Sequence, residues 1–353
     1  MAGGTGGHIM PGLAVAELLR AQGVEVHWLG TAAGLEARLV PKAGIPLHIV
    51  AMRGLRGKSL LSRLLWPWQL LQALIQAVGF MRRISPQVVI GFGGYVAAPG
   101  GIAAWLLRRP LFIHEQNAVA GSTNRALARL ARTVYGAYPG SFPQGVAVEV
   151  VGNPVRADIS ALPGPEQRGL ASEQPLRVLV LGGSQGARIL NQTVPAAVAL
   201  MAPELRPRLR HQAGRDLATA EQAYAQAGLD VEPEAFIEDM PAAYAQADLV
   251  ICRAGALSLA EIMAAGLPAI CVPLAIAIDD HQKANASHLV QAGAAWMLTE
   301  DNCTAEQLAA LLEQVLSQPE ELRRRASKAR ELARPQAAHH LAQACLAAGG
   351  SHD

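Results

Sequence analysis

A chain of 353 residues is longer than one hydrophobic core usually supports, so its length predicts two domains. Hydrophobic residues make up 51% of the chain and charged residues 16%, a balance that excludes a disordered protein. The net charge is only +2, aromatic side chains are few and no nucleic-acid-binding motif is present, so no nucleic-acid partner is expected.

The charge is divided unevenly along the chain. Residues 1–153 contain 14 lysines and arginines against 5 acidic residues, a net charge of +9, and the remaining residues carry −7. This asymmetry predicts an N-terminal half that meets an anionic ligand or surface. The four cysteines lack the spacing of a metal site, and the first residues lack the basic and apolar regions of a signal peptide. We therefore expect a reduced, intracellular protein.

Short β-rich runs alternate with helical patterns. The expected strands cover residues 25–29, 88–90, 111–113, 177–181, 249–252 and 269–272. Apolar strands separated by helices are typical of parallel sheets covered on both faces, which predicts an α/β fold. Turn formers cluster between Gly152 and Pro165, so we expect two Rossmann-like domains, residues 1–155 and 156–335. A helix at about 336–353 is expected to pack back on the first domain.

The first motif is GGTGGH at residues 3–8, which opens a helical pattern. Glycines let the backbone approach a ligand, and the N–H groups at a helix start attract an anion. A histidine in this positive potential is disfavoured as imidazolium, and a neutral imidazole suits a general base, so His8 is the candidate catalytic residue. The alternative is a histidine that only caps the helix or is merely exposed.

Residues 53–83 carry six cations and no acid, with tryptophans inside. The charges, a proline and three glutamines interrupt the apolar run, which argues against a transmembrane helix. One interpretation is an interfacial helix, with Lys58 and Arg63 on lipid headgroups and Trp66 and Trp68 in the lipid. The other is an ordinary amphipathic helix that covers the sheet.

A second glycine motif, GFGGY at residues 91–95, follows an expected strand. It could be simply a tight turn between the strand and the next helix. However, two glycine loops on adjacent strands would make a broad anion cradle where the strands end. The sequence therefore predicts a pyrophosphate site that includes Gly93, Gly94 and Tyr95.

Three motifs follow in the C-terminal half. The loop GGSQGAR at residues 182–188 lacks the spacing of a dehydrogenase fingerprint, and its Ser184 could bind a second diphosphate. In the stretch 252–261, Glu261 could accept hydrogen bonds from two ribose hydroxyls. The alternative is that it is only an acidic residue near a helix start, where its charge interacts favourably with the helix dipole. In the polar cluster DDHQ at residues 279–282, Gln282 could contact sugar hydroxyls, or the cluster is a solvated helix start.

Together with HEQN at residues 114–117, GNPVR at 152–156 and FIEDM at 236–240, these motifs resemble the MurG family across nearly the whole chain. The resemblance implies a GT-B glycosyltransferase, with two Rossmann-like domains whose parallel sheets face across a cleft. It implies inverting transfer of N-acetylglucosamine from UDP-N-acetylglucosamine (UDP-GlcNAc) to the muramyl 4-hydroxyl of undecaprenyl-pyrophosphoryl-MurNAc-pentapeptide (lipid I), giving lipid II. It also implies a peripheral protein on the cytoplasmic face of the bacterial plasma membrane, in contact with anionic lipid and with cell-wall or division proteins.

In the mechanism that we infer, His8 is the base, and because the sequence has no D-x-D motif to hold a divalent ion, we expect no required metal or other cofactor. The donor contacts that the resemblance implies are Thr5, Gly6, Gly7, Asn117, Arg156, Ser184, Ile237, Ala256, Leu257, Ser258, Leu259, Ala260, Glu261 and Gln282. The acceptor pyrophosphate is expected at Gly6, Gly7, Gly93, Gly94 and Tyr95. Uracil is expected near Ile237, ribose on Glu261, and the sugar against Asn117 and Gln282.

Two departures from the family pattern affect these expectations. Only Met1 and Ala2 precede the first glycine loop, too few for a strand, so we expect the first, central strand to be truncated. Either the start of the sequence is cut short, or the N-terminal sheet has a gap. Ala275 and Ile276 stand where relatives often have polar residues, which weakens expected local contacts. The rival functions are another GT-B enzyme such as a UDP-GlcNAc epimerase, a Rossmann-type NAD enzyme, and an impaired nucleotide-binding membrane scaffold.

Overall fold

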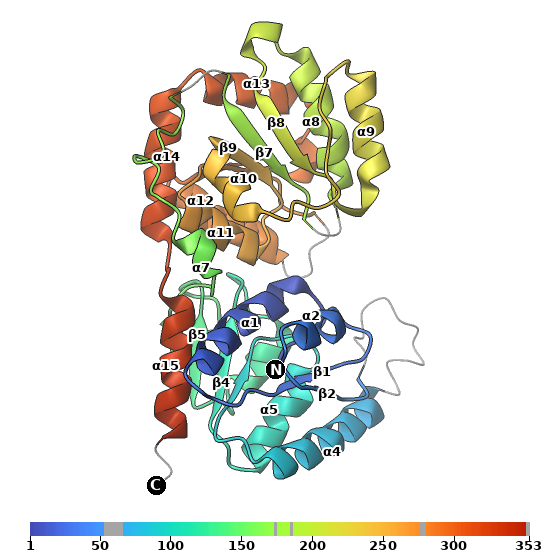
Figure 1. Ribbon diagram of the computed structural model, residues 1–353, viewed down its shortest axis with the longest axis vertical. Helices are drawn as coiled ribbons and strands as arrows, with labels where there is room; N and C mark the ends of the chain where they lie inside the picture. The colour runs from blue at the N-terminus through green and yellow to red at the C-terminus, as the bar shows by residue number, and fades with distance from the viewer. Residues whose placement is uncertain (53–65, 173–174, 184–185, 276–279, 351–353) are drawn as a thin grey trace. The chain divides into compact units, whose positions relative to one another are not determined.

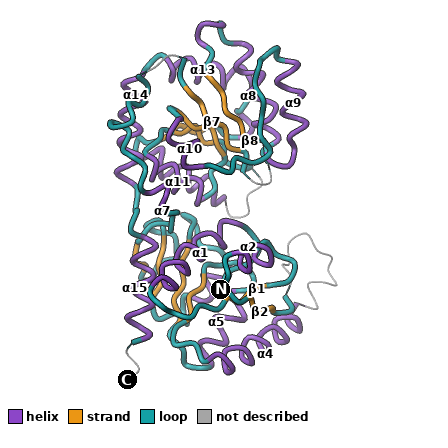
Figure 2. The backbone as a smooth tube through the Cα atoms, viewed as in Figure 1, coloured by secondary structure: helices purple, strands orange, loops and turns teal. Residues whose placement is uncertain are grey.

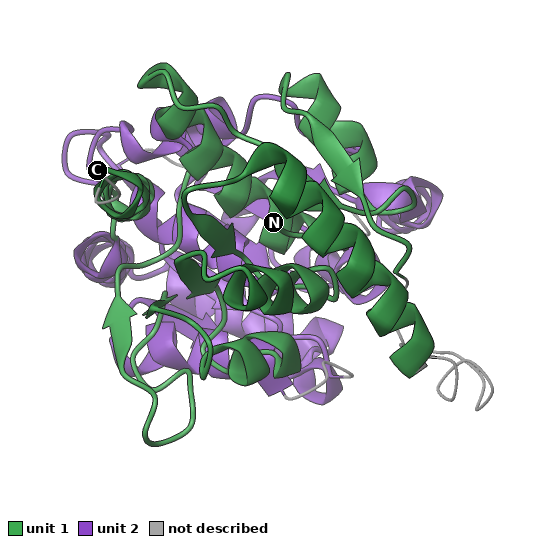
Figure 3. Cartoon of the chain, turned by 90° about the horizontal axis from the view of Figure 1, so that it is seen from below, with its two compact units in different colours: residues 1–155, 334–353 green, residues 156–333 purple. Residues whose placement is uncertain are grey.

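The computed structural model describes residues 1–52, 66–172, 175–183, 186–275 and 280–350 of the chain (Figure 1). The chain divides into two compact units (Figure 3). Unit 1 comprises Met1–Val155 and Arg334–Asp353, and unit 2 comprises Arg156–Ala333. Each unit is an α/β layer structure whose paired strands are all parallel.

Unit 1 contains two separate parallel sheets, β1-β2 and β3-β4-β5-β6. Its strands are β1 (Trp28–Gly30), β2 (Leu47–Ile49), β3 (Val89–Gly91), β4 (Leu111–Glu115), β5 (Thr133–Gly136) and β6 (Val148–Val150). Its helices are α1 (Gly6–Ala21), α2 (Glu36–Lys42), α4 (Trp66–Ile84), α5 (Ala97–Leu106), α6 (Ser122–Leu127) and α15 (Ala337–Gly349). The expected C-terminal helix is thus α15, and it packs against α1.

The expected interruption of the N-terminal sheet lies between β1 and β3. Met1 lies beside β3 and pairs with it through two main-chain hydrogen bonds. Its amino nitrogen donates to the Ile90 carbonyl at 2.8 Å, and Phe92 N donates to the Met1 carbonyl at 3.0 Å. The expectation that the first strand begins at residue 25 was wrong. It begins at Trp28, because its hydrogen-bonded partner β2 pairs with only three residues.

The larger sheet of unit 1 is covered on both faces. Side chains alternate between the faces of a strand, so Leu111 and Ile113 belong to one core cluster and Phe112 to another. The first cluster contains residues of α4 and α5, and the second contains residues of α1 and α15. Strand β4 is therefore buried along its whole length, which explains its unbroken apolar start.

Unit 2 has one five-stranded parallel sheet in the order β11-β10-β9-β7-β8, with helices around it (Figure 2). Its strands are β7 (Arg177–Leu181), β8 (Arg208–Gln212), β9 (Leu249–Cys252), β10 (Ala269–Cys271) and β11 (Ala295–Met297). Its helices are α7 (Ala157–Ser160), α8 (Arg188–Leu200), α9 (Leu217–Gln226), α10 (Met240–Gln246), α11 (Ala256–Ala265), α12 (His281–Gln291), α13 (Ala305–Leu316) and α14 (Pro319–Leu332). Because the strands are parallel, the loops after β7, β9 and β10 leave the same edge of the sheet.

Candidate functional site

The first glycine loop is held by a buried carboxylate. Gly4 has a φ of +98°, which only glycine adopts readily, and α1 begins two residues later. The Gly4 N–H donates to Glu36 Oε2 at 3.0 Å, and the Thr31 N–H and hydroxyl donate to Glu36 Oε1 at 3.1 and 2.8 Å. Glu36 is completely buried, so it fixes the entry to α1. Sequence reasoning missed Glu36, since a single acid in a helical pattern gives no signal.

The two glycine loops of unit 1 lie against each other. A Cβ added to Gly94 would lie 2.3 Å from the Gly3 carbonyl oxygen, and one added to Gly93 would lie 3.2 Å from His8 Nδ1. Both residues also have positive φ, +91° at Gly93 and +79° at Gly94. The Tyr95 hydroxyl lies 3.3 Å from Thr31 Oγ1, beside the carboxylate that holds the first loop. The structure therefore brings the second glycine motif to the loop that carries His8.

His8, in the first turn of α1, contacts the segment after β4. Its Nδ1 lies 3.2 Å from Gln116 Oε1, and Gln116 Nε2 donates to the Phe92 carbonyl at 2.9 Å. Gln116 Nε2 also lies 3.3 Å from Nδ1 of His114. Burial lowers the pKa of His114 to about 4, so this ring is neutral near pH 7. Of the motif at 114–117, only Asn117 was predicted as a site residue, so Gln116 was missed.

Asn117 is oriented by the buried Glu115. Its main-chain and side-chain nitrogens both lie 3.0 Å from Glu115 Oε1. Glu115 Oε2 accepts from Gly121 N at 3.1 Å and from Asn124 Nδ2 at 2.9 Å. The carboxylate thus fixes the turn that presents the partly exposed Asn117.

In unit 2, Glu261 stands on α11 with one carboxylate oxygen held and the other near a cation. The hydroxyl of Tyr244, on α10, donates to Oε2 at 3.0 Å, and Arg156 Nε lies 4.0 Å from Oε1. Burial raises the pKa of Glu261, an effect that Arg156 and Tyr244 partly offset. Burial and the neighbouring carboxylate raise the pKa of Tyr244 well above its ordinary value, so its hydroxyl stays a donor. Tyr244 was not identified from the sequence.

The remaining expected contacts on α11 differ in their exposure. Ala256, Leu259 and Ala260 are buried, whereas Leu257 and Ser258 are partly exposed. Ile237 is completely buried, and its N–H donates to Gln212 Oε1 at 3.3 Å.

The loops after β7 and β10 are held in different ways, the first by close main-chain approach and the second by hydrogen bonds to side chains. A Cβ on Gly214 would lie 2.3 Å from Gly186 N, so only glycine allows this approach beside the third glycine loop. Ser184 of that loop lies outside the described residues. Gln282 Oε1 accepts from Leu274 N at 3.1 Å, and Ala275 N donates to Glu300 at 2.7 Å.

The apolar face of α4 expected to meet lipid is turned away from the core. Trp68, Leu71 and Ile75 are 68%, 46% and 64% exposed, whereas Ala73 and Ala77 are buried against the sheet. Lys58 and Arg63 lie outside the described residues, and α4 begins at Trp66. No helix in the described part of the chain is long and apolar enough to cross a bilayer.

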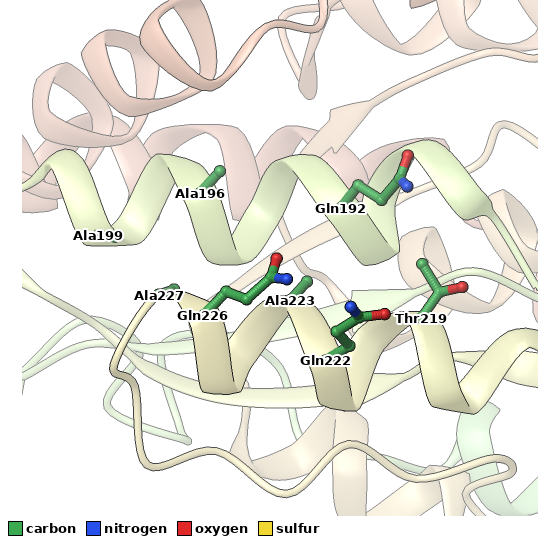
Figure 4. Close-up of a pocket in the computed structure, with 8 residues that line it drawn as sticks. All are labelled: Gln192, Ala196, Ala199, Thr219, Gln222, Ala223, Gln226 and Ala227. Carbon is green, nitrogen blue, oxygen red and sulfur yellow. The ribbon is translucent and has the colours of Figure 1, made fainter.

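A groove in unit 2 contains none of the expected site residues. This groove of about 520 Å³ lies between α8 and α9 and is lined by Gln192, Thr219, Gln222 and Gln226 together with four alanines (Figure 4). Within the described ranges, no group of three or more His, Cys, Asp or Glu side chains is placed to hold a metal ion.

Two family models match the chain. The glycosyltransferase family 28 N-terminal domain matches residues 1–136, and the family 28 C-terminal domain matches residues 177–341. The chain belongs to glycosyltransferase family 28. Its parallel sheets, one set in each unit, are those of the GT-B fold found in this family.

Full-length relatives within family 28 are closely similar to the chain. UDP-N-acetylglucosamine–N-acetylmuramyl-(pentapeptide) pyrophosphoryl-undecaprenol N-acetylglucosamine transferase of Alkalilimnicola ehrlichii is 56% identical over 98% of this chain and 97% of its own length. The transferase of the same name from Nitrosococcus oceani is 53% identical over the same shares. The crystal structure of Acinetobacter baumannii MurG is 40% identical, covers 98% of both chains and superposes with a TM-score of 0.85.

Proposed function

We propose that this glycosyltransferase moves N-acetylglucosamine from UDP-GlcNAc to the muramyl 4-hydroxyl of lipid I, giving lipid II. The observation that carries the proposal is the 56% identity, over nearly the full length, to a transferase whose name states this sugar and this acceptor. The fold supports it, since both units present glycine loops where parallel strands end, the usual ligand position in α/β sheets.

The donor is proposed to bind unit 2 around the start of α11. Tyr244 holds one oxygen of Glu261, which leaves Oε1 to accept ribose hydroxyls. The positive end of the α11 dipole and the guanidinium of Arg156, close to Glu261, suit the diphosphate. The other proposed donor contacts are Thr5, Gly6, Gly7, Asn117, Ser184, Ile237, Ala256, Leu257, Ser258, Leu259, Ala260 and Gln282.

The acceptor pyrophosphate is proposed to bind unit 1, where the glycine loops meet. Main-chain N–H groups of Gly6, Gly7, Gly93 and Gly94 would face its oxygens, with Tyr95 beside them. His8 takes the proton of the muramyl hydroxyl as the oxygen attacks the anomeric carbon. The bond from that carbon to the diphosphate breaks, its electron pair leaves with UDP, and the configuration inverts.

The charge that develops on the leaving diphosphate is proposed to be met by main-chain N–H groups, the α11 dipole and Arg156. The chain contains no D-x-D motif, the usual holder of a divalent ion in sugar-nucleotide transferases. We therefore propose UDP-GlcNAc as donor without a resident metal or other cofactor.

The exposed face of α4 is proposed to dock on the anionic cytoplasmic face of the plasma membrane. Trp68, Leu71 and Ile75 recur at helical spacing on the exposed side, an arrangement that favours shallow insertion into lipid. Arg82 and Arg83 are exposed in the last turn of α4 and suit anionic headgroups. Lys58 and Arg63 are proposed to add to this attraction.

A vesicle experiment tests the membrane proposal. Trp68→Ser combined with Ile75→Ser should abolish most co-sedimentation with anionic vesicles. The matched control is Leu200→Ser, a similarly exposed leucine of unit 2, 58% exposed, which should leave binding unchanged. Equal binding by both variants, or equal binding to neutral and anionic vesicles, would count against this surface.

A transfer assay tests the reaction itself. The purified chain is incubated with radiolabelled UDP-GlcNAc, with and without a soluble lipid I analogue. We expect a disaccharide product of inverted configuration with the acceptor, and no epimerised sugar nucleotide without it. Epimerisation of free UDP-GlcNAc would establish an epimerase instead, and UDP binding with neither reaction would establish a nucleotide-binding scaffold.

A further inference from the structure

A continuous chain of hydrogen bonds leads from His8 into the core of unit 1. Its links are His8 Nδ1 to Gln116 Oε1 at 3.2 Å, Gln116 Nε2 to His114 Nδ1 at 3.3 Å, and His114 Nε2 to the Gly152 carbonyl oxygen at 2.8 Å. Gln116 is 2% exposed and His114 is completely buried. Water therefore does not compete for the inner bonds, and their directions are set by the protein.

Two main-chain carbonyls fix those directions. The Gly152 carbonyl can only accept, so His114 carries its ring proton on Nε2 and keeps a lone pair on Nδ1. The Phe92 carbonyl also can only accept, and it lies 2.9 Å from Gln116 Nε2. The amide nitrogen of Gln116 therefore points to Phe92 and His114, and its oxygen points to His8.

The amide oxygen of Gln116 is an acceptor only, so its bond to His8 requires a proton on Nδ1. A neutral imidazole carries one ring proton, which leaves the lone pair on Nε2. We propose that Gln116 is a positioning residue that sets this tautomer of His8, with His114 orienting Gln116 in turn. The proposal rests on the role of His8 as the general base and identifies Nε2 as the atom that acts.

The tautomer matters for the proton transfer. When the acceptor oxygen attacks, its O–H bond breaks and an N–H bond forms at Nε2, while the diphosphate leaves with its electron pair. The imidazolium that results keeps its Nδ1–H bond to the Gln116 oxygen, which stabilises the charge. A His8 ring protonated on Nε2 instead has no lone pair there and cannot take the proton.

The tautomer can be measured directly on the full chain. In protein labelled with ¹⁵N-histidine, long-range ¹H–¹⁵N spectra at pH 8 distinguish the two tautomers, and His8→Asn identifies the His8 signals. We expect the Nδ1-protonated form in the wild type and a shift towards the Nε2-protonated form in Gln116→Met. A wild-type His8 with its proton on Nε2 overturns the inference, even if Gln116→Met does not fold.

Kinetics separate this inference from the role of His8 itself. Gln116→Met should lower kcat about 10- to 100-fold with an unchanged KM for UDP-GlcNAc. Gln116→Glu, which keeps an acceptor for Nδ1, should recover part of that loss. The matched control is Tyr224→Phe, which removes the partner 2.9 Å from the buried His211 of unit 2 and should leave kcat unchanged.

The two possible failures look different. If His8→Ala is inactive while Gln116→Met matches the Tyr224→Phe control, Gln116 does not position the base and the inference fails alone. If His8→Ala retains full activity, the proposed function of His8 fails, whatever tautomer the spectra show.

Discussion

Because His114 is buried in its neutral form, we expect the free energy of unfolding to fall in acid by an amount that can be worked out. Burial lowers its pKa from the ordinary 6.5 to about 4. Between these values the unfolded chain binds a proton that the folded chain does not, so the free energy of unfolding decreases as the pH falls. A difference of about 2.5 pKa units corresponds to about 3 kcal/mol. This loss is absent above pH 6.5 and complete near pH 4.

The comparison protein is His114→Gln, whose amide can donate to the Gly152 carbonyl and accept from Gln116 but does not titrate. Urea unfolding is followed by tryptophan fluorescence, since four of the five tryptophans lie in unit 1. From pH 6.5 to 4 the wild type should lose about 3 kcal/mol more than the variant. His211, whose pKa is also about 4, is present in both proteins and cancels. Equal losses would show that folded His114 accepts the proton, and would refute the reasoning.

Three further predictions concern other parts of the structure. Because burial raises the pKa of Glu261 above the ordinary 4.5, UDP affinity measured by calorimetry should already fall before the pH reaches 4.5; a profile that stays flat down to that pH would contradict the ribose contact. Arg168→Met removes hydrogen bonds to carbonyls in the last turns of α10 and α11, so the free energy of unfolding should drop by about 3 kcal/mol. Unchanged urea unfolding would show that these hydrogen bonds do not stabilise the protein. Gly94→Ala should destabilise far more than Gly140→Ala in the same assay, since both have positive φ but a Cβ at Gly140 meets no described atom within 4 Å. Equal effects would show that the close approach of Gly94 to Gly3 is unimportant.

The central strands could be predicted from the sequence because burial on both faces leaves an unbroken apolar run. Strands β7 and β9 have the bounds expected, 177–181 and 249–252. The ends of other strands depend on how far a neighbour pairs with them. Residues 24–27 alternate apolar and polar side chains as a strand would, yet β1 begins only at Trp28, where β2 starts to pair with it.

The glycine motifs could be predicted because tight turns and close main-chain approach demand glycine, as Gly94 and Gly186 show. The side chains that hold these loops could not. Glu36, Gln116 and Tyr244 lie 32, 108 and 17 residues from the partners Gly4, His8 and Glu261. Such pairs are set by the packing of distant elements, and no local pattern in the chain marks them.

The central claim is that His8 performs the proton transfer while unit 2 holds the nucleotide. It is tested most directly by measuring kcat and the Kd for UDP on one preparation of His8→Ala. We expect kcat to fall about 10²- to 10⁴-fold with the UDP affinity unchanged. An unchanged kcat, or a loss of UDP affinity as large as that caused by Glu261→Ala, would contradict the account.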